Sequence, residues 1–352
     1  MRYKIGSFNL RNLSKNTITK RDFCKIADII RSEQFDVVAF QEILSEGYAL
    51  EYMVKFYLPG WKIRYKIPRE STDYLKSRDN RGEGYAFLWN TKRLKLASSL
   101  VENGERIFEP RIINQELHLD CGIFARCPMY ARFEPVNGGF FEFRLINIHM
   151  HFGDNTKTEI ERRKEEYNFL LEKIYPRIST ERKYGNNRES YTIVLGDYNL
   201  NLYKPRGEAE KRINKNTYID AIKQVGTQRI ITIQDELTTL KSVQVDESLE
   251  EERFETEVTP ENNKFIRKIV NNKYFRKEDD ETIDNNPNRG YSQNYDHFSF
   301  DVDMFIREGI RYKGKRIDAV RKYCDDDFEM YRMEISDHIP ISLEIIMNEQ
   351  RG

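Results

Sequence analysis

The residues best suited to chemistry lie between Ile193 and Asn201, in the run IVLGDYNLN. Its first three residues are apolar and predict a short buried strand, and Gly196 is expected to end that strand by letting the backbone turn closely. Asp197 and Asn199 follow two residues apart, so their side chains should point the same way. A carboxylate beside a carboxamide suits a divalent cation and a phosphate oxygen, although the pair could also form only an Asx turn.

The same arrangement, an apolar strand that ends in a polar residue, recurs along the chain. A buried histidine in a core is the ordinary explanation for any single histidine of this kind. Histidines, carboxylates and asparagines that all follow strands fit that explanation poorly, and they indicate one site. His297 is expected on the opposite face of its strand, in a structural role. The polar residues at strand ends are Asn9, Glu42, Tyr85, His149, Asp197, Asn199, Asp296, Asp337 and His338.

The elements that must position these residues follow an alternating pattern. Tyr3 to Leu10 and Phe35 to Phe40 predict strands, and the amphipathic stretch from Thr19 to Ser32 predicts a helix between them. A second helix is expected over Thr156 to Ile174, and Ile335 to Ile346 returns to the strand pattern. This order indicates a layered α/β fold.

Composition sets limits on the partners. The chain of 352 residues carries 58 basic and 58 acidic residues, so its formal net charge is zero. A nucleic-acid surface would therefore have to be a local patch of positive charge. No apolar run approaches the ~20 residues of a transmembrane helix. We expect no membrane partner, and no obligate protein partner can be inferred.

The start of the chain and its cysteines suggest a compartment. Met1 to Lys4 leads directly into the first strand without a signal peptide, which predicts a cytoplasmic location. The four cysteines, Cys24, Cys121, Cys127 and Cys324, show no CxxC spacing, so reduced thiols are expected.

The chain changes character after Leu202. Arg206 to Val225 predicts a surface helix, and Asp246 to Arg289 is dominated by charge and asparagine. Within that segment the apolar residues from Phe265 to Val270 predict a docked helix. We interpret residues 204–290 as a charged insertion in a single domain that spans residues 1–352.

Taken together, the short motifs resemble the endonuclease/exonuclease/phosphatase superfamily, whose fold is that of deoxyribonuclease I. The resemblance covers Tyr3 to about Leu202 and Tyr295 to Ile345. It implies a four-layer α/β sandwich in which two packed β-sheets are flanked by helices. The motifs that carry it are SFN (7–9), QE (41–42), EGYAFLW (83–89), ARCPMYARF (125–133), NIHMHFG (147–153), LGDYNLN (195–201), YDHF (295–298) and SDHIP (336–340).

The resemblance implies a metal site. Glu42 and Asp337 would bind Mg²⁺ or Mn²⁺ through carboxylate oxygens, which such hard cations prefer. Asn9, Asp197 and Asn199 would lie around the metal and the phosphate. Whether one or two ions bind stays open.

The resemblance also implies acid–base groups for phosphodiester hydrolysis. His338 would be the general base, and Asp296 would orient its imidazole. His149 would stabilise the phosphate or assist the leaving group. Tyr85 and Arg126 would contact phosphate oxygens.

The fold does not specify the substrate. The leading hypothesis is a Mg²⁺-dependent nuclease, with DNA favoured over RNA. It depends on a basic loop that contains Arg78 and Arg81, and on the stretch from Asn263 to Lys277, where basic and aromatic residues alternate. These charges could instead form solvated surfaces, because acidic blocks lie nearby.

Two alternatives stay open. The first is a phosphatase or phosphodiesterase acting on phosphoinositide, sphingolipid headgroups or small phosphorylated metabolites. A lipid substrate is disfavoured because the sequence contains no convincing amphipathic membrane helix. The second alternative is a binding protein with an inactive site, which the full set of catalytic residue types disfavours.

Overall fold

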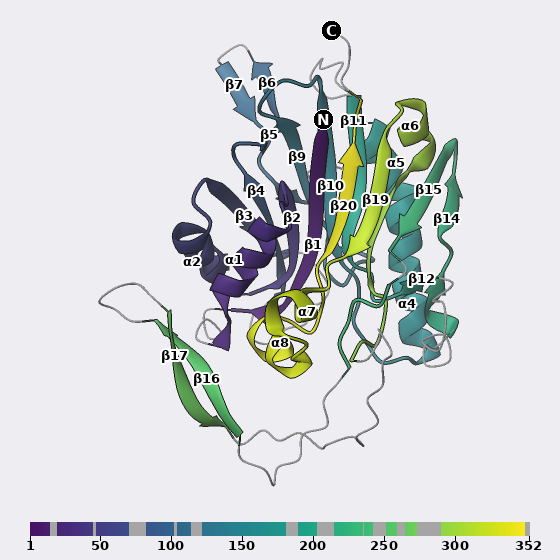
Figure 1. Cartoon of the computed structure of the whole chain (residues 1–352). Helices are drawn as coiled ribbons and strands as arrows, with labels where there is room; N and C mark the ends of the chain where they lie inside the picture. Colours follow the sequence, from purple (N-terminus) through teal and green to yellow (C-terminus); the bar gives the residue numbers. More distant parts are fainter. Residues whose placement is uncertain are drawn as a thin grey trace.

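The computed structural model consists of two β-sheets packed face to face, with helices on both outer sides (Figure 1). The predicted four-layer α/β sandwich is therefore confirmed. The structure describes residues 1–14, 20–44, 47–69, 82–101, 104–113, 122–180, 189–202, 215–234, 236–241, 251–258, 265–272 and 290–348.

The first sheet contains both ends of the described chain. β1 pairs parallel with β2 and antiparallel with β20, so the sheet is mixed. β2 is apolar and buried through Phe40, as expected for a strand that is covered on both faces. In spatial order the strands are β19 (Arg311–Arg316), β20 (Ile341–Ile346), β1 (Arg2–Leu13), β2 (Val37–Ile43), β4 (Gly84–Asn90) and β3 (Trp61–Lys66).

The second sheet is also mixed. Its central strands β10 and β11 run parallel, and their outer neighbours β9 and β18 are antiparallel to them. In spatial order the strands are β14 (Ile222–Val225), β15 (Gln228–Ile233), β18 (Asp296–Asp301), β11 (Glu189–Asp197), β10 (Phe141–His149), β9 (Met129–Pro135) and β5 (Leu94–Leu96), and β8 (Arg111–Ile112) pairs with β9.

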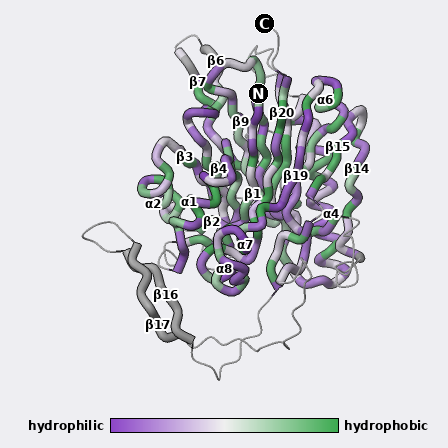
Figure 2. The backbone as a smooth tube through the Cα atoms, in the orientation of Figure 1, coloured by the Kyte–Doolittle hydropathy of each residue, from purple (hydrophilic) through white to green (hydrophobic). Residues whose placement is uncertain are grey.

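Three apolar cores hold the layers together. The core between the sheets joins residues such as Ile5 and Leu343 of the first sheet to Leu145 and Ile193 of the second. Figure 2 shows the hydrophobic positions concentrated in these central strands. The helices α1 (Phe23–Ser32), α2 (Tyr48–Tyr57), α7 (Ala319–Cys324) and α8 (Phe328–Glu334) cover the outer face of the first sheet.

The outer face of the second sheet is covered by one helical segment. It consists of α4 (Lys157–Phe169), a π-helical turn (Leu170–Ile174) and α5 (Tyr175–Thr180). A further short helix, α6 (Val302–Arg307), follows β18. Among the described residues, no helix is both long and apolar enough to cross a membrane.

The second half of the chain differs from two predictions. The described part of the predicted helix Arg206–Val225 is a 3₁₀ turn (Lys215–Thr217), β13 (Tyr218–Ile219) and β14. With β15, β14 extends the second sheet, so part of the predicted insertion belongs to the sandwich. The predicted docked helix around Phe265 is wrong as well, because this segment is a strand.

That strand, β17 (Phe265–Asn272), forms an antiparallel hairpin with β16 (Glu251–Val258). Its β-branched residues favour extended backbone over a helix, a preference that apolar periodicity alone did not reveal. The remaining short strands are β6 (Ser98–Val101) paired with β7 (Gly104–Ile107), and β12 (Asn201–Leu202) paired with β13.

The prediction of four reduced cysteines is wrong for Cys127, which is disulfide-bonded. Cys24 and Cys324 are not disulfide-bonded. The prediction relied on the absence of CxxC spacing, but disulfide formation depends on proximity in the folded chain. Cys121 lies outside the described residues.

Gly196 does not end its strand, because β11 continues through Asp197. Its φ of +144° is one that other residues rarely adopt. A Cβ atom at this position would lie 2.0 Å from the backbone oxygen of Ile148. The glycine therefore allows β10 and β11 to approach closely just before the functional residues.

We predict that Gly196→Ala lowers the free energy of unfolding by about 3 kcal/mol or more, since backbone strain adds to a clash with an immovable carbonyl. Gly226→Ala is the matched control, because Gly226 also has positive φ but open space around it. The control should lose about 1–2 kcal/mol. Urea denaturation measures both, and equal losses would contradict this account of Gly196.

Candidate active site

Strand register brings three of the predicted residues together. His149 of β10 is the register partner of Asp197 of β11, and Asp197 is the partner of Asp296 of β18. Directly paired positions project side chains to the same face of a sheet. The three side chains therefore lie in a row across three neighbouring strands.

The first sheet supplies the facing residues through β1 and β2. Asn9 donates from Nδ2 to Glu42 Oε1 at 2.8 Å and to Asp197 Oδ2 at 3.0 Å. Its side chain therefore joins the two sheets. The other oxygen of Glu42 accepts a hydrogen bond from the backbone N–H of Asn12 at 2.8 Å.

Four residues around the site have left-handed backbone conformations. They are Arg11, Asn12, Glu42 and Asn199, with φ between +44° and +59°. Local hydrogen bonds hold them, among them that of Asn199 N–H to Asp197 Oδ1 at 2.9 Å. The Asx turn considered for this pair is thus present, within a larger cluster. Strained backbone of this kind is typical of functional sites.

One histidine–carboxylate pair is formed by His338 and Asp296. His338 Nδ1 lies 2.9 Å from Asp296 Oδ2, and its Nε2 lies 3.6 Å from Asp197 Oδ2. Thr238 Oγ1 accepts from the backbone N–H of Asp296, which fixes this end of β18. Burial alone would lower the pKa of His338, but Asp296, Asp197 and Asp337 together hold it well above its ordinary value.

A second pair is formed by His149 and Glu83. His149 Nδ1 lies 3.1 Å from Glu83 Oε2, and its Nε2 lies 3.6 Å from the same Asp197 oxygen. Burial would raise the pKa of Glu83, yet His149 and Arg126 bring it down to about 2. Burial and Arg126 would lower the pKa of His149, but Glu83 and Asp197 raise it above its ordinary value.

The donor set fits a divalent cation. Ligand atoms of Glu42, His149 and Asp197 lie within 4.8 Å of one another, and so do those of Asp197, Asp296 and His338. Carboxylate oxygens with imidazole nitrogen suit Mg²⁺, Mn²⁺ and related ions. Glu42 and Asp197, joined through Asn9, are the residues best placed to hold such an ion.

Comparison with known proteins gives a structural match only. No family model matches the sequence, and no curated protein matches it. A humanized D. rerio TDP2 is 12% identical with a TM-score of 0.51, over 98% of this chain and 99% of that one. D. rerio TDP2 in complex with a single-strand DNA product is 13% identical with a TM-score of 0.50, over the same shares.

These likenesses show the fold alone, which is the deoxyribonuclease I-like α/β sandwich. A mannosyl-6-phosphatase of Bacteroides thetaiotaomicron is 14% identical and overlays with a TM-score of 0.46, over 98% of this chain and 100% of that one.

Asp337 lies beside the site, next to two arginines. Its Oδ2 is 3.3 Å from Arg11 Nε and 3.7 Å from Arg332 Nη2. Neither of the two compact ligand groups contains it. A metal-binding role for Asp337 therefore stays a prediction.

Tyr85 and Arg126 lie beneath the site. The Tyr85 hydroxyl donates to the backbone oxygen of Arg126 and accepts from the backbone N–H of His149. Arg126 pairs with Glu83 at 2.6 Å. Both residues are buried, so in this structure they hold the His149 region in place. Contact with a phosphate stays a prediction.

Two further predictions concern His297 and the basic loop. His297 is buried, and its ring nitrogens lie within hydrogen-bonding distance of the backbone oxygens of Leu200 and Gln234. This placement agrees with a structural role. Arg78 and Arg81, predicted to bind substrate, lie outside the described residues.

Sequence reasoning missed Glu83 as the partner of His149. It stands at the start of the quoted run EGYAFLW, two residues before Tyr85, just ahead of β4. A carboxylate beside a tyrosine at the start of a strand was the available signal. Its partner His149 belongs to the other sheet, so nothing in the sequence paired them.

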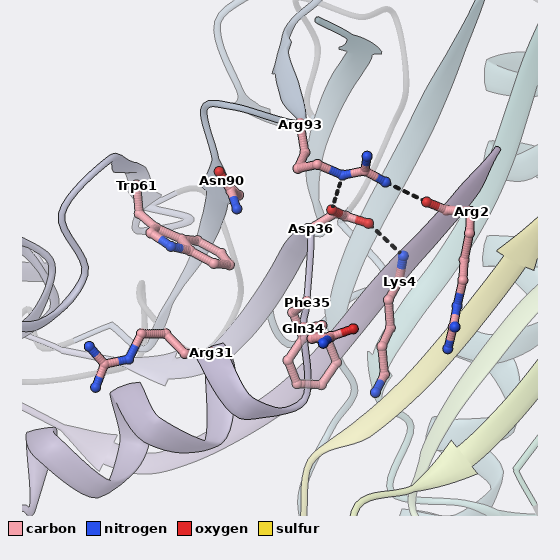
Figure 3. A pocket seen from close by; sticks show the side chains of 9 residues that line it. All are labelled: Arg2, Lys4, Arg31, Gln34, Phe35, Asp36, Trp61, Asn90 and Arg93. Atoms are coloured by element: carbon pink, nitrogen blue, oxygen red, sulfur yellow. Dashed lines mark hydrogen bonds and ion pairs between the residues drawn. The ribbon is translucent and has the colours of Figure 1, made fainter. Parts of the chain in front are cut away.

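A pocket of about 370 Å³ lies at the opposite end of the first sheet (Figure 3). Its positive groups are already matched by carboxylates, as Lys4 is by Glu33 and Arg93 by Asp36. We therefore do not assign the chemistry to it. Its lining residues are Arg2, Lys4, Arg31, Gln34, Phe35, Asp36, Trp61, Asn90 and Arg93.

We predict that Glu83→Gln lowers the pKa of His149 and leaves that of His338 nearly unchanged, because only His149 loses an adjacent negative charge. Histidine NMR titration of the metal-free protein measures both. Glu189→Gln, at an exposed glutamate, is the control. Equal pKa shifts at His149 and His338 would show that the His149–Glu83 and His338–Asp296 pairs do not titrate separately.

Proposed function

We propose that this protein is a divalent-metal-dependent phosphoric ester hydrolase, and specifically a nuclease that cleaves DNA phosphodiester bonds. One observation carries the proposal. A single oxygen of Asp197 lies 3.6 Å from the Nε2 atom of both His149 and His338. Each histidine has its own carboxylate partner on Nδ1.

This geometry gives each imidazole a defined orientation. The carboxylate on Nδ1 favours a proton there, which leaves Nε2 to exchange a proton with substrate or water. We assign His338 as the general base, oriented by Asp296. We assign His149, oriented by Glu83, to the phosphate or the leaving oxygen.

The raised pKa values bear on these roles. In the free protein the pKa of each imidazole is raised by its carboxylate neighbours, and a raised pKa suits a group that carries a proton to a leaving oxygen. His338 must lose its proton to act as a base, and this becomes easier when the charge of Asp197 is neutralised. A divalent cation held by Glu42 and Asp197, with Asn9 beside it, would supply that neutralisation and stabilise charge on the phosphate.

Two observations support DNA as the substrate. The fold is shared with D. rerio TDP2, which has been solved in complex with a single-strand DNA product. Arg11 and Arg332 share the single carboxylate of Asp337, so this trio beside the site carries one excess positive charge in a chain that is neutral as a whole. Such local charge is what a phosphate backbone requires.

We predict that the protein nicks supercoiled plasmid in the presence of Mg²⁺ or Mn²⁺ and that a chelator abolishes nicking. His338→Ala should reduce the rate by about 100-fold or more, because a positioned base contributes about 10²–10⁴. Lys157→Ala, at an exposed lysine of α4, should keep full activity.

The possible outcomes test the assigned substrate and the assigned type of reaction separately. Hydrolysis of phosphomonoesters or lipid headgroups without nicking would contradict the nuclease assignment and leave the hydrolase assignment standing. Full activity of His338→Ala would contradict its role as base. No metal-dependent turnover of any phosphate ester by the folded protein would contradict the proposed function as a whole.

A further inference from the structure

Glu166 is a buried carboxylate that the proposed chemistry does not use. It lies on α4 and is fully buried. Its Oε1 accepts a hydrogen bond from the backbone N–H of Ala125 at 2.6 Å. Its Oε2 accepts from the backbone N–H of His151 at 2.8 Å. One side chain therefore holds two segments that are far apart in the sequence.

Both segments lead directly to the site. Ala125 precedes Arg126, whose guanidinium pairs with Glu83 and donates to the backbone oxygen of Met150. His151 follows Met150, and the Met150 N–H donates to the backbone oxygen of Asp197. The distance between Glu83 and His149 thus depends on how these two segments are held.

We propose that Glu166 is a positioning residue: its two carboxylate oxygens hold the Arg126 segment and the His149 segment in the relative placement that the Glu83–His149 pair requires. The catalytic consequence rests on the proposed function, whereas the placement itself does not.

The role requires a carboxylate in particular. Both partners are N–H donors, so the side chain must offer an acceptor on each oxygen. A protonated acid or a glutamine presents a donor at one of the two positions. The backbone N–H at that position then meets another donor and loses its hydrogen bond. Either change should release one segment and keep the other.

The environment of Glu166 places the protonation of its carboxylate near neutral pH. Burial raises the pKa of Glu166 to about 7, against the lowering effects of the two backbone N–H groups and of Arg162 and Arg126. Burial raises the pKa of the Tyr85 hydroxyl, and the charge of Glu166 adds to this effect, while the His151 ring pairs with Glu159. Glu166 accepts both backbone hydrogen bonds only when it is ionised. This double contact should therefore be lost as the pH falls through about 7.

The first test needs no catalysis. In NMR spectra of the wild-type protein, the amide protons of Ala125 and His151 should shift together with a common midpoint near pH 7. In Glu166→Gln this shared transition should disappear. Glu165→Gln, at the exposed neighbouring position on the same helix, should retain it. If the two amides titrate independently or not at all, the proposal is wrong.

The second test concerns the rate. Between pH 6 and pH 8 the kcat of the wild type and of Glu165→Gln should contain an ionisation near pH 7 that Glu166→Gln lacks. At pH 8 Glu166→Gln should be about 10-fold slower, within the range of 10–100-fold for residues that orient catalytic groups.

A general loss of stability would lower the rate at all pH values without removing that ionisation, and it would overturn the proposal. Absence of turnover by the wild type would contradict the proposed function alone, because the amide titration still decides the role of Glu166.

Discussion

The hydrogen bond from the Asn9 amide to Asp197 is the contact on which the site depends, because it joins the two sheets where their functional residues meet. Asp197 is 1% exposed, and a charge buried to that extent is tolerated only when donors surround it. The donors are the Asn9 amide and the Asn199 backbone N–H, and the Nε2 atoms of the two histidines lie 3.6 Å away. The hydrogen bonds to this buried carboxylate therefore favour the observed packing of the two sheets.

The arrangement around Asp197 is nearly symmetric. His149 with Glu83 lies on one side, and His338 with Asp296 lies on the other. Strand register explains most of it, since His149, Asp197 and Asp296 are direct neighbours across β10, β11 and β18. Gly196 makes the close approach of β10 and β11 possible. A tertiary fold with three apolar cores thus serves to hold two imidazoles on either side of one carboxylate.

Much of this could be predicted from the sequence because functional residues follow apolar strands, and strands end at a shared edge. That rule located Asn9, Glu42, His149, Asp197, Asp296 and His338, which the structure brings together. It could not find Glu83 as the partner of His149, since the pairing crosses between sheets. It also could not show that Arg11 lies beside Asp337, because these two positions are hundreds of residues apart.

The errors of local reasoning have physical causes. The segment from Phe265 to Val270 has apolar residues that suit one helical face, but its β-branched residues pair with β16 instead. Cys127 lacks a neighbouring CxxC partner, yet it is disulfide-bonded. For the segment from Phe265 to Val270 the deciding factor is its pairing with the preceding strand β16.

The measurement that tests the central claim most directly is an NMR titration of His149 and His338 in metal-free Asp197→Asn. The account predicts that both pKa values fall together, because each imidazole loses the same nearby negative charge while its own carboxylate partner remains. A fall at only one histidine, or at neither, in a folded variant would contradict the view that one carboxylate unites two histidine pairs into a single site.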